Sequence, residues 1–290
     1  SIISQKPCGV NIDITSVVSY TLFGINLKIT QWGVHSMKYT QLIFSPTGGT
    51  EKAAKMVTSE WSTSVETVDL TNSAVDFSKC QAKADDLVLI ALPSYGGRVP
   101  GLAAERLAKI QGNSAKCVLL CVYGNRAYED TLVEMADIAK KAEFTVVAAI
   151  SAVAEHSIMH QYASGRPDRE DEYQLKSFAT VILEKFRAGT LTEEPQLPGN
   201  RPYKKAGGVG LVPKAGASCN GCGLCADSCP AGAISKDNLK AANAKKCISC
   251  MRCVVRCPQG ARTVNGALIS VASLAIKKAC SKAKENELFV

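Results

Sequence analysis

The chain has few of the features on which membrane proteins and acid–base enzymes depend. It contains only 3 histidines, 2 tryptophans and 6% aromatic residues. Its charge-free stretch at residues 14–27 is interrupted by Thr, Ser, Gly and Asn, and it is too short to cross a bilayer. No glycine-rich loop ends in the G-K-[ST] of a Walker phosphate loop, and no nucleophile with an acid–base partner is visible. These absences argue against a membrane span and a Walker-type nucleotide site, and they leave any chemistry to a bound cofactor.

The first 36 residues also lack a recognisable role. A lone Lys6 and the absence of a small-residue cleavage site argue against a signal peptide. The alternation of strands and helices begins only after Met37. We therefore expect residues 1–36 to be a poorly ordered extension, or Met37 to be the natural start, and we expect deletion of residues 1–36 to leave cofactor content unchanged.

Cysteine, in contrast, is abundant: the chain has 13, and eight of them fall into two runs. The first run is Cys219, Cys222, Cys225 and Cys229, followed by Pro230. Adding 28 to each position gives the second run, Cys247, Cys250, Cys253 and Cys257, followed by Pro258. This repeated C-x-x-C-x-x-C-x-x-x-C-P pattern is the bacterial iron–sulfur ligand spacing. Eight thiolates so spaced can hold two [4Fe–4S] clusters.

Residues 213–265 accordingly resemble the bacterial two-[4Fe–4S] ferredoxins, with Asn220 and Met251 as departures from the usual pattern. The resemblance implies that each run lends its fourth cysteine to the other run's cluster. One ligand set is then Cys219, Cys222, Cys225 and Cys257. The other is Cys247, Cys250, Cys253 and Cys229. Structural zinc and a disulfide framework are the alternatives, although zinc usually takes two separated C-x-x-C pairs.

The five remaining cysteines are Cys8, Cys80, Cys117, Cys121 and Cys280. Cys117 and Cys121 lie four residues apart in an apolar run, which predicts small buried core side chains on one face of a strand. Clusters together with free thiols are typical of a reducing cytosol, so we expect a cytoplasmic protein.

The net charge of +8 is unevenly distributed. Residues 201–290 hold 15 Lys and Arg against 4 Asp and Glu, whereas residues 37–200 hold 17 against 21. Two interpretations stay open: a basic face that steers an acidic redox partner, or basic residues that offset the negative clusters. Nucleic-acid binding is disfavoured because no basic surface is interleaved with aromatic residues.

Residues 37–188 alternate between apolar strands and amphipathic helices. Strands are expected at 40–44, 65–70, 87–92, 117–122 and 144–153. Helices are expected at 50–61, 102–110, 129–142 and 169–187, with a further C-terminal helix at 268–284. This alternation predicts an α/β domain with a doubly wound, five-stranded parallel sheet. The ligands of such sheets bind beyond the carboxyl ends of the strands.

Three loops at those strand ends have unusual compositions. The first combines hydroxyls and glycines before a helix, which is typical of an anion site: Ser45, Pro46, Thr47, Gly48, Gly49 and Thr50. The second places an aromatic beside two glycines: Ser94, Tyr95, Gly96 and Gly97. The third is Tyr123, Gly124, Asn125, Arg126 and Tyr128. A capping turn, half-buried tyrosines and surface arginines at Arg98 and Arg126 are the plainer interpretations.

These loops resemble the phosphate and ring loops of flavodoxins. Gly49 departs from a frequent asparagine, and the ring loops lack the acidic residues of short flavodoxins. The resemblance implies that residues 37–188 bind FMN at the three loops, and that they precede a small α+β two-cluster ferredoxin domain. His156 follows the fifth strand and is a candidate to hydrogen-bond the flavin or relay a proton to it, or else a loop-packing histidine.

The resulting organisation is an extension (1–36), a flavodoxin-like domain (37–188), a proline-rich linker (189–212), a two-cluster domain (213–265) and a C-terminal helix (266–290). This architecture predicts electron transfer between two [4Fe–4S] clusters and FMN, coupling one-electron and two-electron redox partners. The alternatives are an FMN-dependent reductase of a small oxidant and a redox-sensing module. Whether the chain is an enzyme, and its oligomeric state, stay open.

Overall fold

The computed structural model describes residues 17–22, 25–30, 37–207 and 210–290. Within the expected N-terminal extension, β1 (Val17–Leu22) and β2 (Ile25–Thr30) pair as an antiparallel hairpin. The other residues of that extension lie outside the described part of the chain. The prediction that the extension is poorly ordered therefore stays untested.

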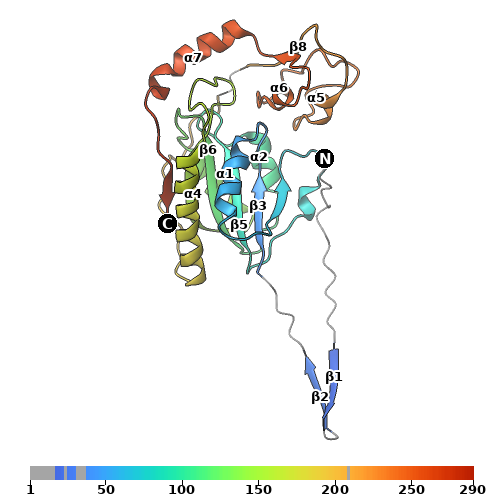
Figure 1. Ribbon diagram of the computed structural model, residues 1–290, viewed down its shortest axis with the longest axis vertical. Helices are drawn as coiled ribbons and strands as arrows, with labels where there is room; N and C mark the ends of the chain where they lie inside the picture. The colour runs from blue at the N-terminus through green and yellow to red at the C-terminus, as the bar shows by residue number, and fades with distance from the viewer. Residues whose placement is uncertain (1–16, 23–24, 31–36, 208–209) are drawn as a thin grey trace.

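One six-stranded sheet forms the centre of the larger domain (Figure 1). Its strands are β3 (Tyr39–Ile43), β4 (Glu66–Asp69), β5 (Leu87–Pro93), β6 (Lys116–Tyr123), β7 (Thr145–Val153) and β10 (Glu287–Phe289). Their spatial order is β10-β7-β6-β5-β3-β4, and the five strands from β3 to β7 are parallel. Numbered along this domain, the parallel strands have the order 2-1-3-4-5, which is the flavodoxin-like form of the doubly wound sheet. The predicted fold class is confirmed.

Helices cover both faces of this sheet, because the central strands are apolar on both sides. On one face lie α1 (Gly49–Thr58) and α4 (Arg169–Arg187). On the other lie α2 (Gly101–Leu107) and α3 (Thr131–Lys141). Strand β5 contributes to both layers: Val88, Ile90 and Leu92 pack on the α2–α3 side, and Leu87, Leu89 and Ala91 on the α1–α4 side. Such burial on both faces explains its uninterrupted apolar sequence.

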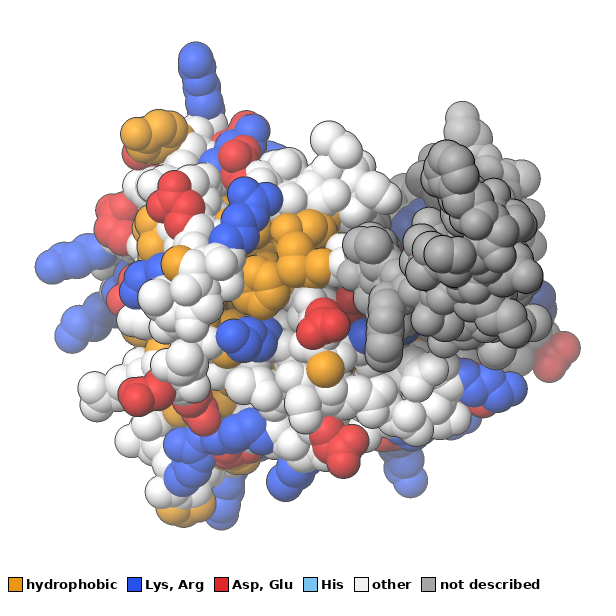
Figure 2. Space-filling model, turned by 90° about the horizontal axis from the view of Figure 1, so that it is seen from below, with side chains coloured by type: hydrophobic (Ala, Val, Ile, Leu, Met, Phe, Trp, Pro, Cys, Tyr) orange, Lys and Arg blue, Asp and Glu red, His pale blue; other side chains and the backbone are white. Residues whose placement is uncertain are grey.

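The cysteine-rich module is much smaller and lies beyond the carboxyl ends of the strands (Figure 1). It has a two-stranded antiparallel sheet, β8 (Lys214–Ala215) with β9 (Arg262–Thr263). Two short helices, α5 (Leu224–Asp227) and α6 (Arg252–Val255), occupy equivalent places in the two cysteine runs. The opposite end of the molecule carries scattered charges of both signs around a hydrophobic patch (Figure 2).

The C-terminal segment returns from the cysteine module to the sheet. Helix α7 (Gly266–Cys280) has Asn265 as its N-cap and begins close to the predicted start at residue 268. It ends four residues before the predicted end at residue 284. It contacts the larger domain through Ser273, whose backbone oxygen accepts a hydrogen bond from the Tyr162 hydroxyl at 2.9 Å. The chain then adds β10 antiparallel to β7, a strand of three residues that the sequence did not indicate. No helix in the described ranges is long and apolar enough to cross a membrane.

Candidate cofactor site

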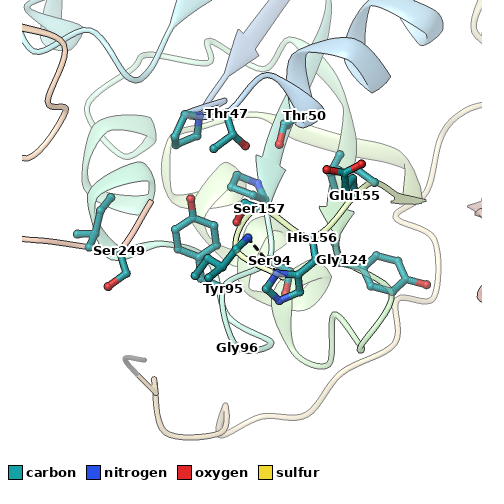
Figure 3. A pocket seen from close by; sticks show the side chains of 18 of the residues that line it. Thr47, Thr50, Ser94, Tyr95, Gly96, Gly124, Glu155, His156, Ser157 and Ser249 are labelled. Carbon is teal, nitrogen blue, oxygen red and sulfur yellow. Dashed lines mark hydrogen bonds between the residues drawn. The ribbon is translucent and has the colours of Figure 1, made fainter. Parts of the chain in front are cut away.

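A cavity of about 420 Å³ opens at the carboxyl ends of β3, β5, β6 and β7 (Figure 3). Its volume falls in the range of roughly 300–1,000 Å³ that small-molecule and cofactor sites occupy. Ten of the candidate residues from the sequence line it: Pro46, Thr47, Gly49, Thr50, Ser94, Tyr95, Gly96, Tyr123, Gly124 and His156. The sequence thus located this cavity through loops that lie far apart along the chain.

The loop between β3 and α1 has the features of an anion site. Gly48 caps α1 with a left-handed φ of 99° and offers no side-chain acceptor to the first N–H groups of the helix. Thr47 and Thr50 line the cavity at this helix end (Figure 3). Ser45 does not line it; its Oγ accepts a hydrogen bond from Glu51 N at 2.9 Å and holds the loop. Open amides with two hydroxyls at a positive helix end fit a phosphate group.

The second loop is a tight turn. Tyr95 N donates to Arg98 O at 2.9 Å, and between them Gly96 and Gly97 have left-handed φ angles of 62° and 84°. Gly97 does not line the cavity. A Cβ on Gly97 would lie 1.7 Å from a carboxylate oxygen of Glu129. Burial, followed by the charge of the nearby Cys250, holds the pKa of Tyr95 well above its ordinary value. The turn thus presents an apolar, neutral tyrosine at the cavity.

The third loop only partly agrees with the prediction. Tyr123 and Gly124 line the cavity, whereas Asn125, Arg126 and Tyr128 do not. Asn125 instead donates through Nδ2 to the backbone oxygens of Cys280 and Lys282, at 3.0 and 2.9 Å. The structural reason is the returning C-terminal segment, which occupies this side of the loop.

The two other side chains of this loop have partners outside the cavity as well. Arg126 pairs with Glu129 at 2.8 Å. The Tyr128 hydroxyl donates to Glu287 in β10 at 2.6 Å, and its ring meets Tyr123 edge-on with centroids 5.1 Å apart. Asn125 and Tyr128 therefore fix the loop against the C-terminal segment, and Arg126 braces the loop internally through Glu129. They form no part of the cavity wall.

His156 lies in the cavity with its protonation pattern set by the backbone (Figure 3). Its Nδ1 accepts hydrogen bonds from the N–H groups of Ile158 and Met159, both at 3.2 Å. An acceptor Nδ1 places the ring proton on Nε2. Burial, followed by the charge of nearby His160, lowers the pKa of His156. The ring is therefore a neutral donor, and its role toward a flavin stays a prediction.

Gly124 is required by this histidine. A Cβ on Gly124 would lie 2.8 Å from both Cβ and Cδ2 of His156. Only glycine allows the third loop and the loop after β7 to approach so closely.

The linker forms another wall of the cavity through Gly207, Gly210 and Val212. It is anchored on α3 and the turn before it. Asp130 accepts hydrogen bonds from the backbone N–H groups of Asn200 and Lys204, at 2.8 and 2.7 Å. Asp137 accepts two bonds from the Arg201 guanidinium, both at 2.8 Å. The proline-rich composition indicated a linker, but no sequence signal indicated that this linker lies across the site.

The eight cysteines of the two runs form no disulfides and are grouped around two smaller cavities. One cavity is lined by Cys219, Cys222, Cys225 and Cys257. The other is lined by Cys229, Cys247, Cys250 and Cys253. Among the described residues, no three His, Cys, Asp or Glu side chains converge closely enough to hold one metal ion.

The surroundings of these thiols fit bound iron–sulfur clusters. Ala233 N donates to Cys229 Sγ and Ala261 N donates to Cys257 Sγ, both at 3.3 Å, so the two runs repeat the same contact. Arg262, with 1% of its surface exposed, places Nη1 3.5 Å from Cys225 Sγ. Backbone and guanidinium donors around sulfur stabilise thiolate ligands and tune cluster potentials.

The comparison with known families agrees with the cysteine spacing. Residues 218–262 match the family model described as a 4Fe-4S dicluster domain. No curated protein matches the chain in sequence. The match and the sheet topology together give a 4Fe–4S dicluster domain joined to an α/β domain with the flavodoxin strand order.

Several solved structures are similar to the larger domain. A flavodoxin from Streptococcus pneumoniae is 19% identical, with a TM-score of 0.37, and covers 51% of this chain and 99% of its own. Rubredoxin oxygen:oxidoreductase from Desulfovibrio gigas is 17% identical, with a TM-score of 0.39, over 52% of this chain and 36% of its own. An FMN-dependent NADH-azoreductase from Bacillus anthracis is 9% identical, with a TM-score of 0.33, over 50% of this chain and 99% of its own.

Proposed function

We propose that the chain is an electron-transfer protein that carries FMN and two [4Fe–4S] clusters and couples one-electron to two-electron redox partners. The observation that supports this most directly is a shared cavity. Cys247 of the second run lines the same cavity as the three loops at the strand ends. A flavin site and a cluster site with a common wall are suited to direct electron exchange.

Different groups of residues bind different parts of the cofactor in this proposal. The N–H groups at the start of α1, with Thr47 and Thr50, bind the phosphate. Tyr95 and Tyr123 supply aromatic surface, and the linker glycines Gly207 and Gly210 exclude water from one side. Bound FMN supplies chemistry in one- or two-electron steps, and each cluster supplies one-electron steps.

The cysteines are assigned to the clusters as they are grouped. Cys219, Cys222, Cys225 and Cys257 ligate one cluster, and Cys229, Cys247, Cys250 and Cys253 ligate the other. Each set contains one cysteine from the opposite run, as the ferredoxin resemblance implies.

Anaerobic purification or reconstitution, followed by counting of iron, sulfide and flavin, tests this proposal. We expect about eight irons and one FMN per chain, as two clusters and one flavin site require. Two zinc ions and no flavin would overturn both halves of the proposal.

A second candidate function, reduction of a small oxidant at the flavin, is favoured by His156. This neutral donor lines the cavity and is available to a substrate there. The reduced protein should be offered ferredoxin-type acceptors and small oxidants separately. Fast turnover with the small oxidant alone would favour the reductase.

A further inference from the structure

The two cysteine runs have the same backbone but different surroundings. In the first run, Gly221 and Gly223 both have φ of 76°. The equivalent residues of the second run, Ser249 and Met251, keep this left-handed conformation with φ of 53° and 61°. Left-handed backbone is unfavourable for residues with a Cβ. The second run therefore carries side chains where the loop geometry favours glycine.

The segment that carries Ser249 faces the larger domain. Ser249 lines the large cavity together with Tyr95 and Gly96 (Figure 3). Its neighbour Ile248 lines the same cavity. Ile248 also packs against the apolar layer between the sheet and helices α2 and α3. The equivalents of Ile248 and Ser249 in the first run, Asn220 and Gly221, are exposed. A Cβ on Gly221 would meet no atom within 4 Å.

Two arginines hold this side of the cysteine module against the larger domain. Arg252, from the second run, donates through Nη1 to Ser45 O in the loop before α1 at 3.2 Å, and its Nη2 lies 3.8 Å from Asp69. Arg106 of α2 donates to Leu70 O and to Pro230 O, both at 2.6 Å. Pro230 follows Cys229, the cysteine of the first run that lines the second-run cavity. The equivalent of Arg252 in the first run is Leu224, which is exposed.

From these contacts we infer that the second cysteine run is part of the flavin site. Its Ile248–Ser249 segment forms one wall of the FMN pocket, and the Ser249 hydroxyl is a binding group for the cofactor. The first run takes no part in that wall, and its cluster would lie on the exposed side of the module. This inference rests on the proposed function, since it requires that FMN occupies the cavity.

The chemistry of the segment suits this role. Ile248 offers an apolar surface to a flat ring, and a serine hydroxyl both donates and accepts hydrogen bonds. Ordering of the segment depends on its flanking ligands, Cys247 and Cys250. FMN affinity should therefore depend on the second-run cluster and be independent of the first-run cluster.

A matched pair of substitutions tests the wall. Ser249→Gly removes the hydroxyl and relieves the left-handed backbone, so the variant should fold at least as well as the parent. We expect its Kd for FMN to rise about fivefold, the effect of one lost hydrogen bond. Gly221→Ser, the mirror change in the first run, should leave the Kd within about twofold. Binding is measured by quenching of flavin fluorescence with the iron-loaded chain, and melting temperature and iron content are recorded.

A second pair tests the dependence on the clusters. Cys250→Ala and Cys222→Ala change equivalent ligands and should each remove about four irons. We expect the Kd for FMN to rise about tenfold or more in Cys250→Ala alone, because its loop loses the order on which the pocket depends. Equal effects in the two variants, or no effect of Ser249→Gly, would overturn the inference. Failure of the parent chain to bind FMN would instead overturn the proposed function.

Discussion

The sheet domain buries two extensive apolar layers, whereas the apolar cluster of the cysteine module contains Cys225, Ile234 and Cys253. Two of these three residues are proposed cluster ligands. An α/β domain with helices on both faces has a core of its own. A module of about 50 residues with so few buried side chains should depend on bound metal for much of its folding free energy. The two regions should therefore respond differently to loss of cofactors and to changes in packing.

The largest difference should appear when iron is removed. Chelation should abolish amide protection in residues 213–265 and leave it intact in β5 and β6, because only the module loses its core. Hydrogen exchange read by mass spectrometry measures both regions at once. Removal of FMN alone is the control and should leave the module protected. A protected module in the iron-free chain would show that it folds without metal.

Core truncation in the sheet should have the opposite selectivity. Leu119 in β6 is fully buried, and Leu119→Ala should lower the free energy of unfolding of the sheet domain by about 2–5 kcal/mol. Iron content should stay at the parent value. The control is Leu268→Ala on the exposed side of α7, with an expected change within about 0.5 kcal/mol. Denaturant unfolding gives the free energies, and loss of iron from Leu119→Ala would show that the two regions are coupled.

Arg262 should matter to the module alone. Its buried guanidinium donates to Leu239 O at 2.6 Å and to Pro213 O at 3.1 Å. Arg262→Met leaves these oxygens unpaired and should destabilise the module by about 1–3 kcal/mol. The measurement is the rate of iron release to a chelator, with the exposed Arg256→Met as control. Equal rates in the two variants would contradict this role.

The smallest effect concerns the linker that joins the two regions. The hydrogen bond from Arg201, opposed by desolvation and helped by a hydrogen bond from Tyr203, lowers the pKa of Asp137 to about 2. Because this value is below the ordinary 3.8, the carboxylate stabilises the attached linker above about pH 4 and loses that effect as the pH falls through about 2. Amide exchange of residues 199–204, expressed relative to that of an unstructured chain at the same pH, should therefore accelerate over this window. In Asp137→Asn it should be fast at every pH, and parent-like exchange in that variant would contradict the prediction.

Local chemistry explains how much the sequence predicted. Five strands, four helices and three cavity loops were recognisable, because apolar runs, caps and glycine–hydroxyl turns are encoded by neighbouring residues. Helix α4 has the predicted bounds, and its N-cap Asp168 forms a capping box with Asp171. Strand β10 was missed because three residues carry no period that can be measured. Tyr128 was predicted to line the cofactor cavity, but it contacts Glu287 instead. The sequence could not indicate this contact, because the two residues are more than 150 positions apart.

By itself, the sequence determined two local features: the thiol spacing repeated after 28 residues and the glycine–hydroxyl turn after the first strand of the parallel sheet. Both depend on short stretches of chain. The tertiary structure alone decided which cysteine run meets the three loops at the strand ends, because the two runs have identical spacing. The choice follows from long-range contacts, among them Arg252 with Ser45 and Arg106 with Pro230. Ile248 and Ser249 then occupy the cavity wall, and Asn220 and Gly221 stay in solvent.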